Sequence, residues 1–212
     1  MYAKYFKRLI DFCFSLFGLI LLSPLMVVLT VTGAIVMKGN PFFIQKRPGK
    51  KDKNGNEKIF SLIKFRTMTC EKDKDGNLLP DELRLNKYGR FLRATSLDVL
   101  PELVCIMCGN MSLIGPRPLL PKYLDRFTEE QRHRHDVRPG LTGLAQINGR
   151  NALCWEDRFK LDLEYVANVT FFGDLKIFFQ TVLKVLKREG ISSEASATME
   201  EFMGTVDLNG TK

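Results

Sequence analysis

The feature that most constrains this chain is an uncharged run of 26 residues, Phe12 to Met37. A straight α-helix of that length extends about 39 Å, enough to cross a hydrocarbon core of about 30 Å. A cleaved signal peptide has an apolar region of about 7–15 residues followed by a small-residue cleavage site, and this run is too long and lacks that site. We therefore expect residues 1–38 to form a membrane anchor.

Two features argue against a straight transmembrane helix. Pro24 stands near the middle of the run, where it removes one backbone hydrogen bond and kinks a helix, although the Ser23 hydroxyl can repair part of the loss. Positive charge normally stays on the cytoplasmic side of a membrane, yet both flanks are basic: Lys4, Lys7 and Arg8 precede the run, and Lys38, Lys46, Arg47, Lys50 and Lys51 follow it. We therefore predict a re-entrant helix, bent at Ser23-Pro24, that returns to the face from which it enters.

The chain as a whole has the composition of a small globular protein. Over its 212 residues, 45% are hydrophobic and 26% are charged, which excludes wholesale disorder. The formal net charge of +8 indicates an anionic partner such as nucleic acid, lipid head groups or a phosphorylated substrate. We do not expect nucleic acid, because the sequence has no recognised binding motif and no aromatic stacking platform. We predict one domain over residues 39–190 and a flexible C-terminal tail over residues 191–212.

Turn signals and hydrophobic periodicity indicate an α+β fold that is predominantly helical. Two short strands, 42–44 and 59–65, flank a charged loop that carries Asn54-Gly55, a strong turn signal. Residues 82–108 are predicted to be helical in two pieces. A further amphipathic helix is predicted over 174–189, and two placements stay open for it: its apolar side packs on the core, or it lies in the bilayer interface.

Asp98 is a candidate for an ionised, functional carboxylate. Ser96 fits the N-cap of the second helical piece, which places Asp98 in the first turn. The exposed amides and the helix dipole favour the ionised form of a carboxyl group there. An ordinary capping acid has the same pattern, so position alone leaves both interpretations open.

Three short strings rich in glycine, proline and arginine occur within 36 residues, at 115–118, 138–146 and 148–150. Glycine and proline form rigid turns, and a guanidinium group binds phosphate through two hydrogen bonds, so rigidly mounted arginines indicate a diphosphate ligand. The candidate residues are Arg117 with Pro118, Arg138 and Arg150. The neighbouring His133 and His135 have no clear third ligand, so we expect them to pack and hydrogen-bond rather than bind metal.

In this order and spacing, the motifs resemble those of the monotopic phosphoglycosyl transferases, the bacterial sugar transferase family, and above all its small members of the PglC type. The similarity covers nearly the whole chain. Its strings are Lys7-Arg8 with Ser23-Pro24, Phe43 to Gly49, Lys64 to Met68, Arg93 to Asp98, Met111 to Pro118, and His133 to Ala152.

The resemblance implies a re-entrant membrane helix and a small catalytic domain on the cytoplasmic face of the bacterial inner membrane. It implies transfer of a sugar-1-phosphate from a UDP-sugar to polyprenol phosphate, such as undecaprenyl phosphate, with release of UMP. The implied cofactor is Mg²⁺. The reaction is the first membrane step of glycan assembly, and the implied partners are the UDP-sugar, polyprenol phosphate and membrane lipid.

The resemblance also assigns roles to single positions. Asp98 matches the nucleophile that forms a phosphosugar–aspartyl intermediate, with polyprenol phosphate as the second attacking group. Lys64, Arg93 and Arg150 match basic residues around the phosphates, and Arg117 with Pro118 matches the element near the nucleotide. The expected anchor residues are Lys7, Arg8, Ser23 and Pro24.

One position departs from the family pattern. The family has an Asp-Glu pair, whereas Val99 follows Asp98 here. The nearest acid on the same helical face is Glu102, which we consider as a partial substitute, so that Asp98 and Glu102 are the candidate Mg²⁺ ligands. The alternative function is a catalytically impaired, membrane-docked protein that binds UDP-sugar or polyprenol phosphate.

Overall fold

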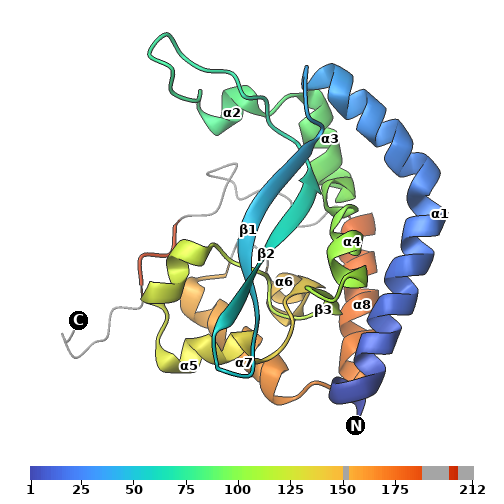
Figure 1. Cartoon of the computed structure of the whole chain (residues 1–212), viewed down its shortest axis with the longest axis vertical. Helices are drawn as coiled ribbons and strands as arrows, with labels where there is room; N and C mark the ends of the chain where they lie inside the picture. The colour runs from blue at the N-terminus through green and yellow to red at the C-terminus, as the bar shows by residue number, and fades with distance from the viewer. Residues whose placement is uncertain (150–152, 188–200, 205–212) are drawn as a thin grey trace.

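The computed structural model describes residues 1–149, 153–187 and 201–204. A short π-helical turn (Tyr2–Phe6) continues directly into α1 (Lys7–Val36), the one helix in these ranges that is long and apolar enough to cross a membrane. Helix α1 curves along one side of the molecule (Figure 1). Pro24 lies inside it, and the Ser23 hydroxyl donates a 2.8 Å hydrogen bond to the Ile20 carbonyl, the group that a residue with an N–H at position 24 would bond. The predicted repair at the proline is confirmed.

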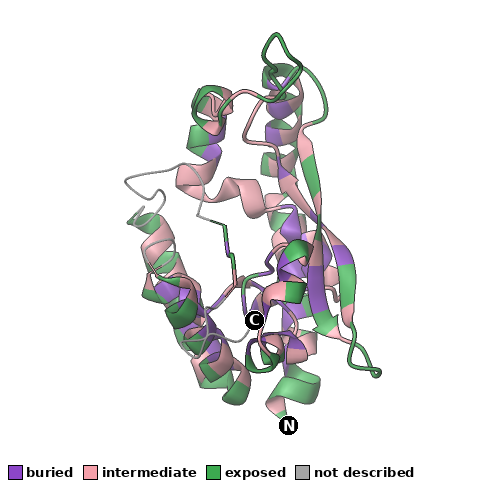
Figure 2. Ribbon diagram, turned by 90° about the vertical axis from the view of Figure 1, so that its left-hand side faces the viewer, coloured by how far each residue is buried: buried purple, intermediate pink, exposed green. Residues whose placement is uncertain are grey.

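A long antiparallel hairpin follows the helix. Strand β1 (Phe42–Lys51) pairs with β2 (Glu57–Phe65), and the turn between them places Gly55 at φ +85°. Both predicted strands are present and are longer than expected. Residues 70–78 beyond the hairpin are exposed, whereas buried residues gather in the lower half of the hairpin and on the helices beside it (Figure 2).

The predicted helical region after the hairpin is broken into four short pieces. They are α2 (Asp81–Arg84), α3 (Lys87–Thr95), the 3₁₀-helix η2 (Leu97–Val99) and α4 (Glu102–Met107). Ser96 separates α3 from η2 with a left-handed backbone conformation, φ 55°. It precedes η2, but its side chain makes no capping hydrogen bond, so the expected N-cap interaction is absent.

The second half of the domain is built around a small parallel pair of strands. Strand β3 (Ser112–Ile114) pairs with β4 (Gly140–Thr142). Between them lie the 3₁₀-helix η3 (Pro121–Arg126), α5 (Glu129–Arg132) and the 3₁₀-helix η4 (His133–Asp136). Helices α6 (Leu144–Asn148), α7 (Trp155–Ala167) and α8 (Phe171–Leu186) follow β4. The described residues thus form a mixed, predominantly helical fold, as predicted.

Glycines in the two strings around β3 and β4 allow backbone segments to approach each other closely. A Cβ atom on Gly115 would lie 2.4 Å from the Arg138 carbonyl, and one on Gly143 would lie 2.1 Å from the Gly115 carbonyl. The Gly115 amide donates to the Thr142 carbonyl at 2.9 Å. These glycines therefore pack one string against the other, so their first role is to fix the position of the loop that carries Arg117.

The apolar side of α8 does not pack on the core. Its large side chains stay exposed, from 37% for Phe178 to 79% for Phe172, while Ile177 and Asp174 face inward. Of the two placements left open by the sequence, core packing is wrong. The exposed apolar surface of α8 adjoins that of α1, where the Phe14 and Phe178 rings meet edge to face at 6.4 Å.

The C-terminal residues 201–204 are packed against the domain. Phe202 is 1% exposed and lies in an aromatic cluster with Tyr123, Phe127, Trp155 and Phe159. Glu201 pairs with Lys122 at 2.7 Å and with Arg126 at 2.9 Å. This corrects the expectation of a flexible tail for these four residues. The rest of that tail lies outside the described residues.

Candidate active site

Asp98 is presented by the short helix η2. Leu97 and Leu100, three residues apart and therefore on one side of the turn, pack against the buried cluster of Leu29, Phe65 and Leu92. Asp98 therefore projects to a different side, where it is partly buried. The core contacts of its neighbours fix the position of the carboxylate.

A buried ion pair lies beside Asp98. Lys64, near the end of β2, places its Nζ atom 3.0 Å from Oε1 of Glu102, which opens α4 and is 4% exposed. Burial raises the pKa of the Glu102 carboxyl, Lys64 and Arg117 oppose that shift, and the charge of Asp98 raises it further. The two carboxyl groups are therefore close enough to influence each other, although they lie on separate helices, η2 and α4, rather than on one helical face.

Arginines from two other elements complete this group. Arg93, on α3, donates through Nε to the Thr67 hydroxyl at 3.1 Å. Arg117 follows β3 in an exposed position next to the buried Pro118. The charges of Lys64, Arg117 and Arg93 all act on Asp98. We call Lys64, Arg93, Asp98, Glu102 and Arg117 the Asp98 cluster.

The electrostatic state of Asp98 differs from the one expected from a helix dipole. Burial raises the pKa of its carboxyl group, and Lys64, Arg117 and Arg93 offset only part of that shift. Helix η2 has three residues, too few to supply a substantial macrodipole. The surrounding cations, rather than the helix terminus, are thus the main groups that stabilise the ionised carboxylate.

One of the predicted ligand-binding arginines, Arg138, makes its contacts outside this group. Arg138 donates through Nε to the Gly109 carbonyl at 2.8 Å, and the charges nearest to it are those of Arg8 and Asp11. This contact joins the segment before β4 to the turn after α4, and the assignment of Arg138 to the substrate stays a prediction. Arg150 lies outside the described residues.

The predicted anchor residues tie α1 to the domain. Arg8 donates to the carbonyls of Ile106 and Met107, each at 2.6 Å. Lys7 is 9% exposed and pairs with Asp174 at 2.6 Å, so it faces the protein rather than lipid head groups. Ser23 and Pro24 are exposed within α1, where the bend was predicted.

The two histidines that precede the string at 138–146 differ: His133 is hydrogen-bonded, as expected, whereas the ring nitrogens of His135 have no hydrogen-bond partner among the described residues. His133 contacts Asp136 through Nδ1 at 2.6 Å. His135 is buried against Phe127, and burial together with Arg134 lowers its pKa to about 3, so its imidazole is neutral at pH 7. In the described part of the chain, no group of three or more His, Cys, Asp or Glu side chains is arranged to hold a metal ion.

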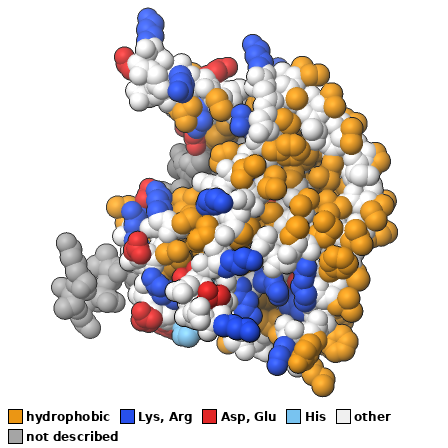
Figure 3. Space-filling model, in the orientation of Figure 1, with side chains coloured by type: hydrophobic (Ala, Val, Ile, Leu, Met, Phe, Trp, Pro, Cys, Tyr) orange, Lys and Arg blue, Asp and Glu red, His pale blue; other side chains and the backbone are white. Residues whose placement is uncertain are grey.

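Sequence reasoning missed two arginines near Arg117. They are Arg47 on β1 and Arg158 on α7, and the charge of Arg117 acts on both. The only signal for Arg158 is its spacing of four residues from Asp162, which places both on one face of a helix. Lys and Arg side chains gather on the lower middle of the face seen in Figure 3, while hydrophobic side chains cover the edge formed by α1.

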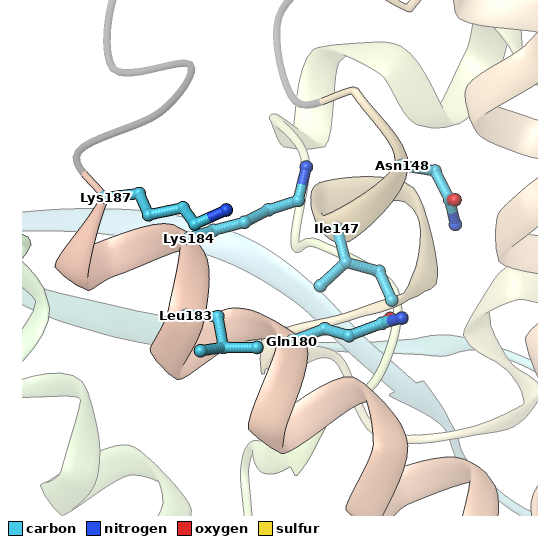
Figure 4. A pocket seen from close by; sticks show the side chains of 6 residues that line it. All are labelled: Ile147, Asn148, Gln180, Leu183, Lys184 and Lys187. Carbon is cyan, nitrogen blue, oxygen red and sulfur yellow. The ribbon is translucent and has the colours of Figure 1, made fainter.

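A separate pocket lies between α6 and α8 (Figure 4). It is lined by Ile147, Asn148, Gln180, Leu183, Lys184 and Lys187. No member of the Asp98 cluster lines it, so this pocket is distinct from the site described above.

Comparison with known proteins places the chain in a family. The model of the bacterial sugar transferase family matches residues 2–188. The uncharacterized sugar transferase EpsL of Bacillus subtilis is 49% identical over 204 residues, covering 96% of this chain and 98% of EpsL. The undecaprenyl-phosphate galactose phosphotransferase of Salmonella typhimurium is 34% identical over 207 residues, covering 89% of this chain and 42% of that protein.

A third relative is the UDP-glucose:undecaprenyl-phosphate glucose-1-phosphate transferase of Klebsiella pneumoniae, 37% identical over 189 residues. These residues are 84% of this chain and 40% of the relative. This chain thus spans less than half the length of the Salmonella and Klebsiella proteins and nearly all of EpsL. The resemblance seen in the motifs is confirmed, and the chain belongs to the bacterial sugar transferase family.

Proposed function

We propose that this protein transfers a sugar-1-phosphate from a UDP-sugar to polyprenol phosphate and releases UMP. The observation that carries the proposal is the Asp98 cluster: a partly buried carboxylate with Lys64, Arg93 and Arg117 around it. Cations in this arrangement both favour the ionised nucleophile and stabilise negative charge on a diphosphate. The names of the Salmonella and Klebsiella relatives, an undecaprenyl-phosphate galactose phosphotransferase and a glucose-1-phosphate transferase, support the same reaction class.

In the first step, a carboxylate oxygen of Asp98 attacks the β-phosphorus of the UDP-sugar. An oxygen–phosphorus bond forms, the bond from that phosphorus to the bridging oxygen breaks, and UMP leaves with the electron pair. Lys64, Arg93 and Arg117 stabilise the charge on the transferring and departing phosphates. In the second step, a phosphate oxygen of polyprenol phosphate attacks the same phosphorus and restores the Asp98 carboxylate.

The donor set around Asp98 is compatible with Mg²⁺. Magnesium is commonly held by one or two carboxylates plus substrate phosphates and water, and Asp98 with Glu102 supplies two carboxylates. Lys64 pairs with Oε1 of Glu102, and Oε2 would be the oxygen that faces a ligand. A bound Mg²⁺ would neutralise charge on the diphosphate.

We also propose that α1 is re-entrant and that the domain lies on the cytoplasmic face of the bacterial inner membrane. Near one end of α1, Arg8 bonds to α4; near the other, the Leu29 carbonyl accepts a 2.8 Å hydrogen bond from the Tyr88 hydroxyl of α3. These two positions lie about 32 Å apart along a straight helix, the thickness of a hydrocarbon core. A straight crossing would therefore require the polar domain to span the bilayer with it. The exposed apolar side of α8 lies in the interface in this arrangement.

Intact-protein mass spectrometry tests the reaction. After incubation with a UDP-sugar and Mg²⁺ in detergent, without polyprenol phosphate, we expect a mass increase of one sugar phosphate that is absent from Asp98→Asn. Addition of undecaprenyl phosphate should remove the adduct. Folded protein that binds UMP but yields neither an adduct nor UMP release from any UDP-sugar would contradict the proposal and favour the impaired binding protein.

Labelling tests the topology. Single cysteines at Lys4 and Lys38, in a background with the exposed native cysteines replaced by serine, should both stay protected from a membrane-impermeant maleimide in intact spheroplasts. Both should react once the membrane is permeabilised. Labelling of one of the two in intact spheroplasts would show that α1 crosses the bilayer.

A further inference from the structure

A second cluster of charged groups adjoins the Asp98 cluster through Arg117. Its centre is a buried ion pair: Arg134 and Asp162 each expose 1% of the side chain, and Arg134 donates to Oδ2 of Asp162 at 2.6 and 3.1 Å. Arg134 also donates through Nη2 to the main-chain carbonyl of Arg117 at 2.8 Å. The pair therefore fixes the backbone of the loop that carries Arg117.

Arg158 extends this group on α7. It precedes Asp162 by one helical turn, and its guanidinium carbon lies 4.9 Å from the centre of the Trp155 ring. The side chain is 5% exposed. Burial and the positive charges of Arg117 and Arg134 together lower the pKa of Arg158 to about 10. The negative charge of Asp162 opposes this shift. Arg158 thus remains charged at pH 7 in a buried site that contains two other arginines.

Arg47 approaches from the hairpin. Its Nη2 atom donates to Gln45 Oε1 at 2.6 Å, on the same side of β1. Its Nε atom is buried and has no hydrogen-bond partner in the described part of the chain. Burial and the charge of Arg117 lower the pKa of Arg47 to about 10. A buried donor without an acceptor, next to another guanidinium group, is the environment expected when an anionic ligand completes the site.

The charges of the two clusters do not balance. Their carboxylates are Asp98, Glu102 and Asp162, and their cations are Arg47, Lys64, Arg93, Arg117, Arg134 and Arg158. Among these described side chains cations outnumber carboxylates, even when Asp81, whose charge acts on Arg93, is counted with them. Partly buried like charges repel each other strongly unless a counter-ion lies between them, and the phosphates of a nucleotide sugar supply one.

We propose that Arg47 and Arg158, together with Arg117, form the subsite that holds the nucleotide phosphate of the UDP-sugar, with Arg134 and Asp162 as positioning residues. This inference rests on the proposed function for the identity of the ligand. Polyprenol phosphate has a phosphate group too, but the location favours the nucleotide. Helix α7 packs against η4 and α6, and η4 against β1, whereas α1 packs mainly against α4 and β3, so Arg158 belongs to the part of the domain away from the membrane helix.

The single tryptophan of the chain provides the assay. Because Trp155 stacks on Arg158, UMP binding should change its fluorescence without any turnover. We expect Arg47→Gln and Arg158→Gln each to weaken UMP binding by about tenfold or more, the usual effect of losing a charged hydrogen bond. Arg158→Lys should recover part of the affinity. Calorimetric titration with UMP provides a second measurement for the Arg158 variants, whose tryptophan environment is altered.

Lys160→Gln is the matched control, since it removes one positive charge from the exposed surface of the same helix and should leave the affinity for UMP unchanged. Folded Arg47→Gln and Arg158→Gln proteins that bind UMP as tightly as the unmodified protein would overturn the proposal. The proposal would also be overturned if geranyl phosphate, used in place of polyprenol phosphate, competed with UMP and its affinity fell equally in these variants. UMP binding requires no chemical step, so the two proposals can be tested separately. UMP binding that is unchanged in the variants would contradict the subsite even if the phosphosugar adduct forms. Absence of the adduct would contradict the proposed function even if the variants bind UMP less tightly.

Discussion

Two buried polar clusters of this molecule differ in how completely their groups are paired. The first joins α1 to α8, and we call it the anchor cluster: Tyr2, Lys7, Tyr165 and Asp174. Asp174 accepts hydrogen bonds from Lys7 and Tyr2 at 2.6 Å each and from Tyr165 at 2.8 Å, so one cation meets one carboxylate. The second comprises the arginines around Arg117, where cations are in excess and Arg47 Nε has no partner in the described residues.

The difference separates structural polar groups from functional ones. Buried polar groups are normally satisfied within the protein, as in the anchor cluster, because an unmet hydrogen bond or an unpaired charge is costly. In an incompletely paired cluster, the unfavourable free energy of the unmet hydrogen bonds and unpaired charges remains until a ligand binds. Substitutions in the anchor cluster should therefore affect stability first, whereas substitutions around Asp98 and Arg117 should affect ligand binding or reaction first.

The largest expected effect is that of Asp98→Asn. Loss of the proposed nucleophile should lower UMP release by about 10⁴-fold or more. The melting temperature should not fall, because burial already favours the neutral form of this carboxyl group and asparagine is a neutral isostere. The measurements are UMP release and thermal unfolding in the same detergent. A marked drop in melting temperature would show that Asp98 stabilises the fold, as the anchor cluster does. That result would contradict the distinction between the two clusters.

Asp174→Asn should have the opposite profile. It leaves Lys7 buried without its counter-charge, and removing one partner of a buried pair costs about 3 kcal/mol or more. Thermal or denaturant unfolding measures this loss, and the affinity for UMP below the melting temperature should be unchanged. The control is Asp157→Asn on α7, whose exposed carboxylate lies 3.8 Å from Lys160 and should contribute little to stability.

Val99→Glu tests whether the Asp98 cluster has an acidic group missing. A second carboxylate beside Asp98 should raise turnover and Mg²⁺ affinity by on the order of tenfold, the range associated with supporting groups at metal sites. The measurement is the rate of UMP release across a Mg²⁺ titration, with Val99→Gln as the uncharged control. Equal rates for Val99→Glu, Val99→Gln and the unmodified protein would indicate that Glu102 already provides that function.

The sequence predicts local features well where the physical cause is local. The hairpin follows from two apolar runs around Asn54-Gly55, and the hydrogen bond from Ser23 to Ile20 follows from the missing amide of Pro24. The family motifs also indicated that Lys64, Arg93, Asp98 and Arg117 act together, and the structure brings these four side chains into one cluster.

Contacts between distant segments were not predictable in the same way. In the sequence, Lys7 is no different from the other lysines that flank the apolar run. Only the structure shows that it pairs with Asp174, 167 positions away. Arg138 belongs to a conspicuous string, yet its guanidinium group binds a backbone carbonyl. Arg47 belongs to the string Phe43 to Gly49 and Arg158 lies four residues before Asp162, but neither pattern indicates that the charge of Arg117 acts on both in the folded protein. Phe202 lies in a polar tail and is buried only because the aromatic cluster gives it a site.

Acidification should stop adduct formation at a higher pH than the ordinary pKa of an aspartate predicts. Asp98 must be ionised to attack, and its pKa is raised above the usual value of about 3.9, so the rate of adduct formation should fall about tenfold per pH unit below that raised pKa. The sign is opposite for stability: because the folded pKa is raised, the Asp98 contribution to stability is fully present below the unfolded pKa and is lost as pH rises through the folded pKa.

Single-turnover adduct formation from pH 4 to 8, followed by mass spectrometry, checks this prediction. Thermal unfolding over the same range verifies that the protein stays folded. A rate that stays constant down to about pH 4 would mean that the cations of the Asp98 cluster outweigh burial, and would make this carboxylate as fully compensated as Asp174.

The smallest expected effect concerns backbone strain beside the incomplete cluster. Ser96 adopts φ 55°, a left-handed conformation that costs a residue with a Cβ atom about 1 kcal/mol. Ser96→Gly removes that cost but increases the entropy of the unfolded chain, so we expect a net gain of at most about 1 kcal/mol in the free energy of unfolding. Ala94→Gly, in the helical turn just before it, should instead lose about 1 kcal/mol. If Ser96→Gly raises stability while slowing adduct formation, the strained turn helps to hold Asp98 in its reactive position; a loss of stability like that of Ala94→Gly would show that Ser96 is unstrained.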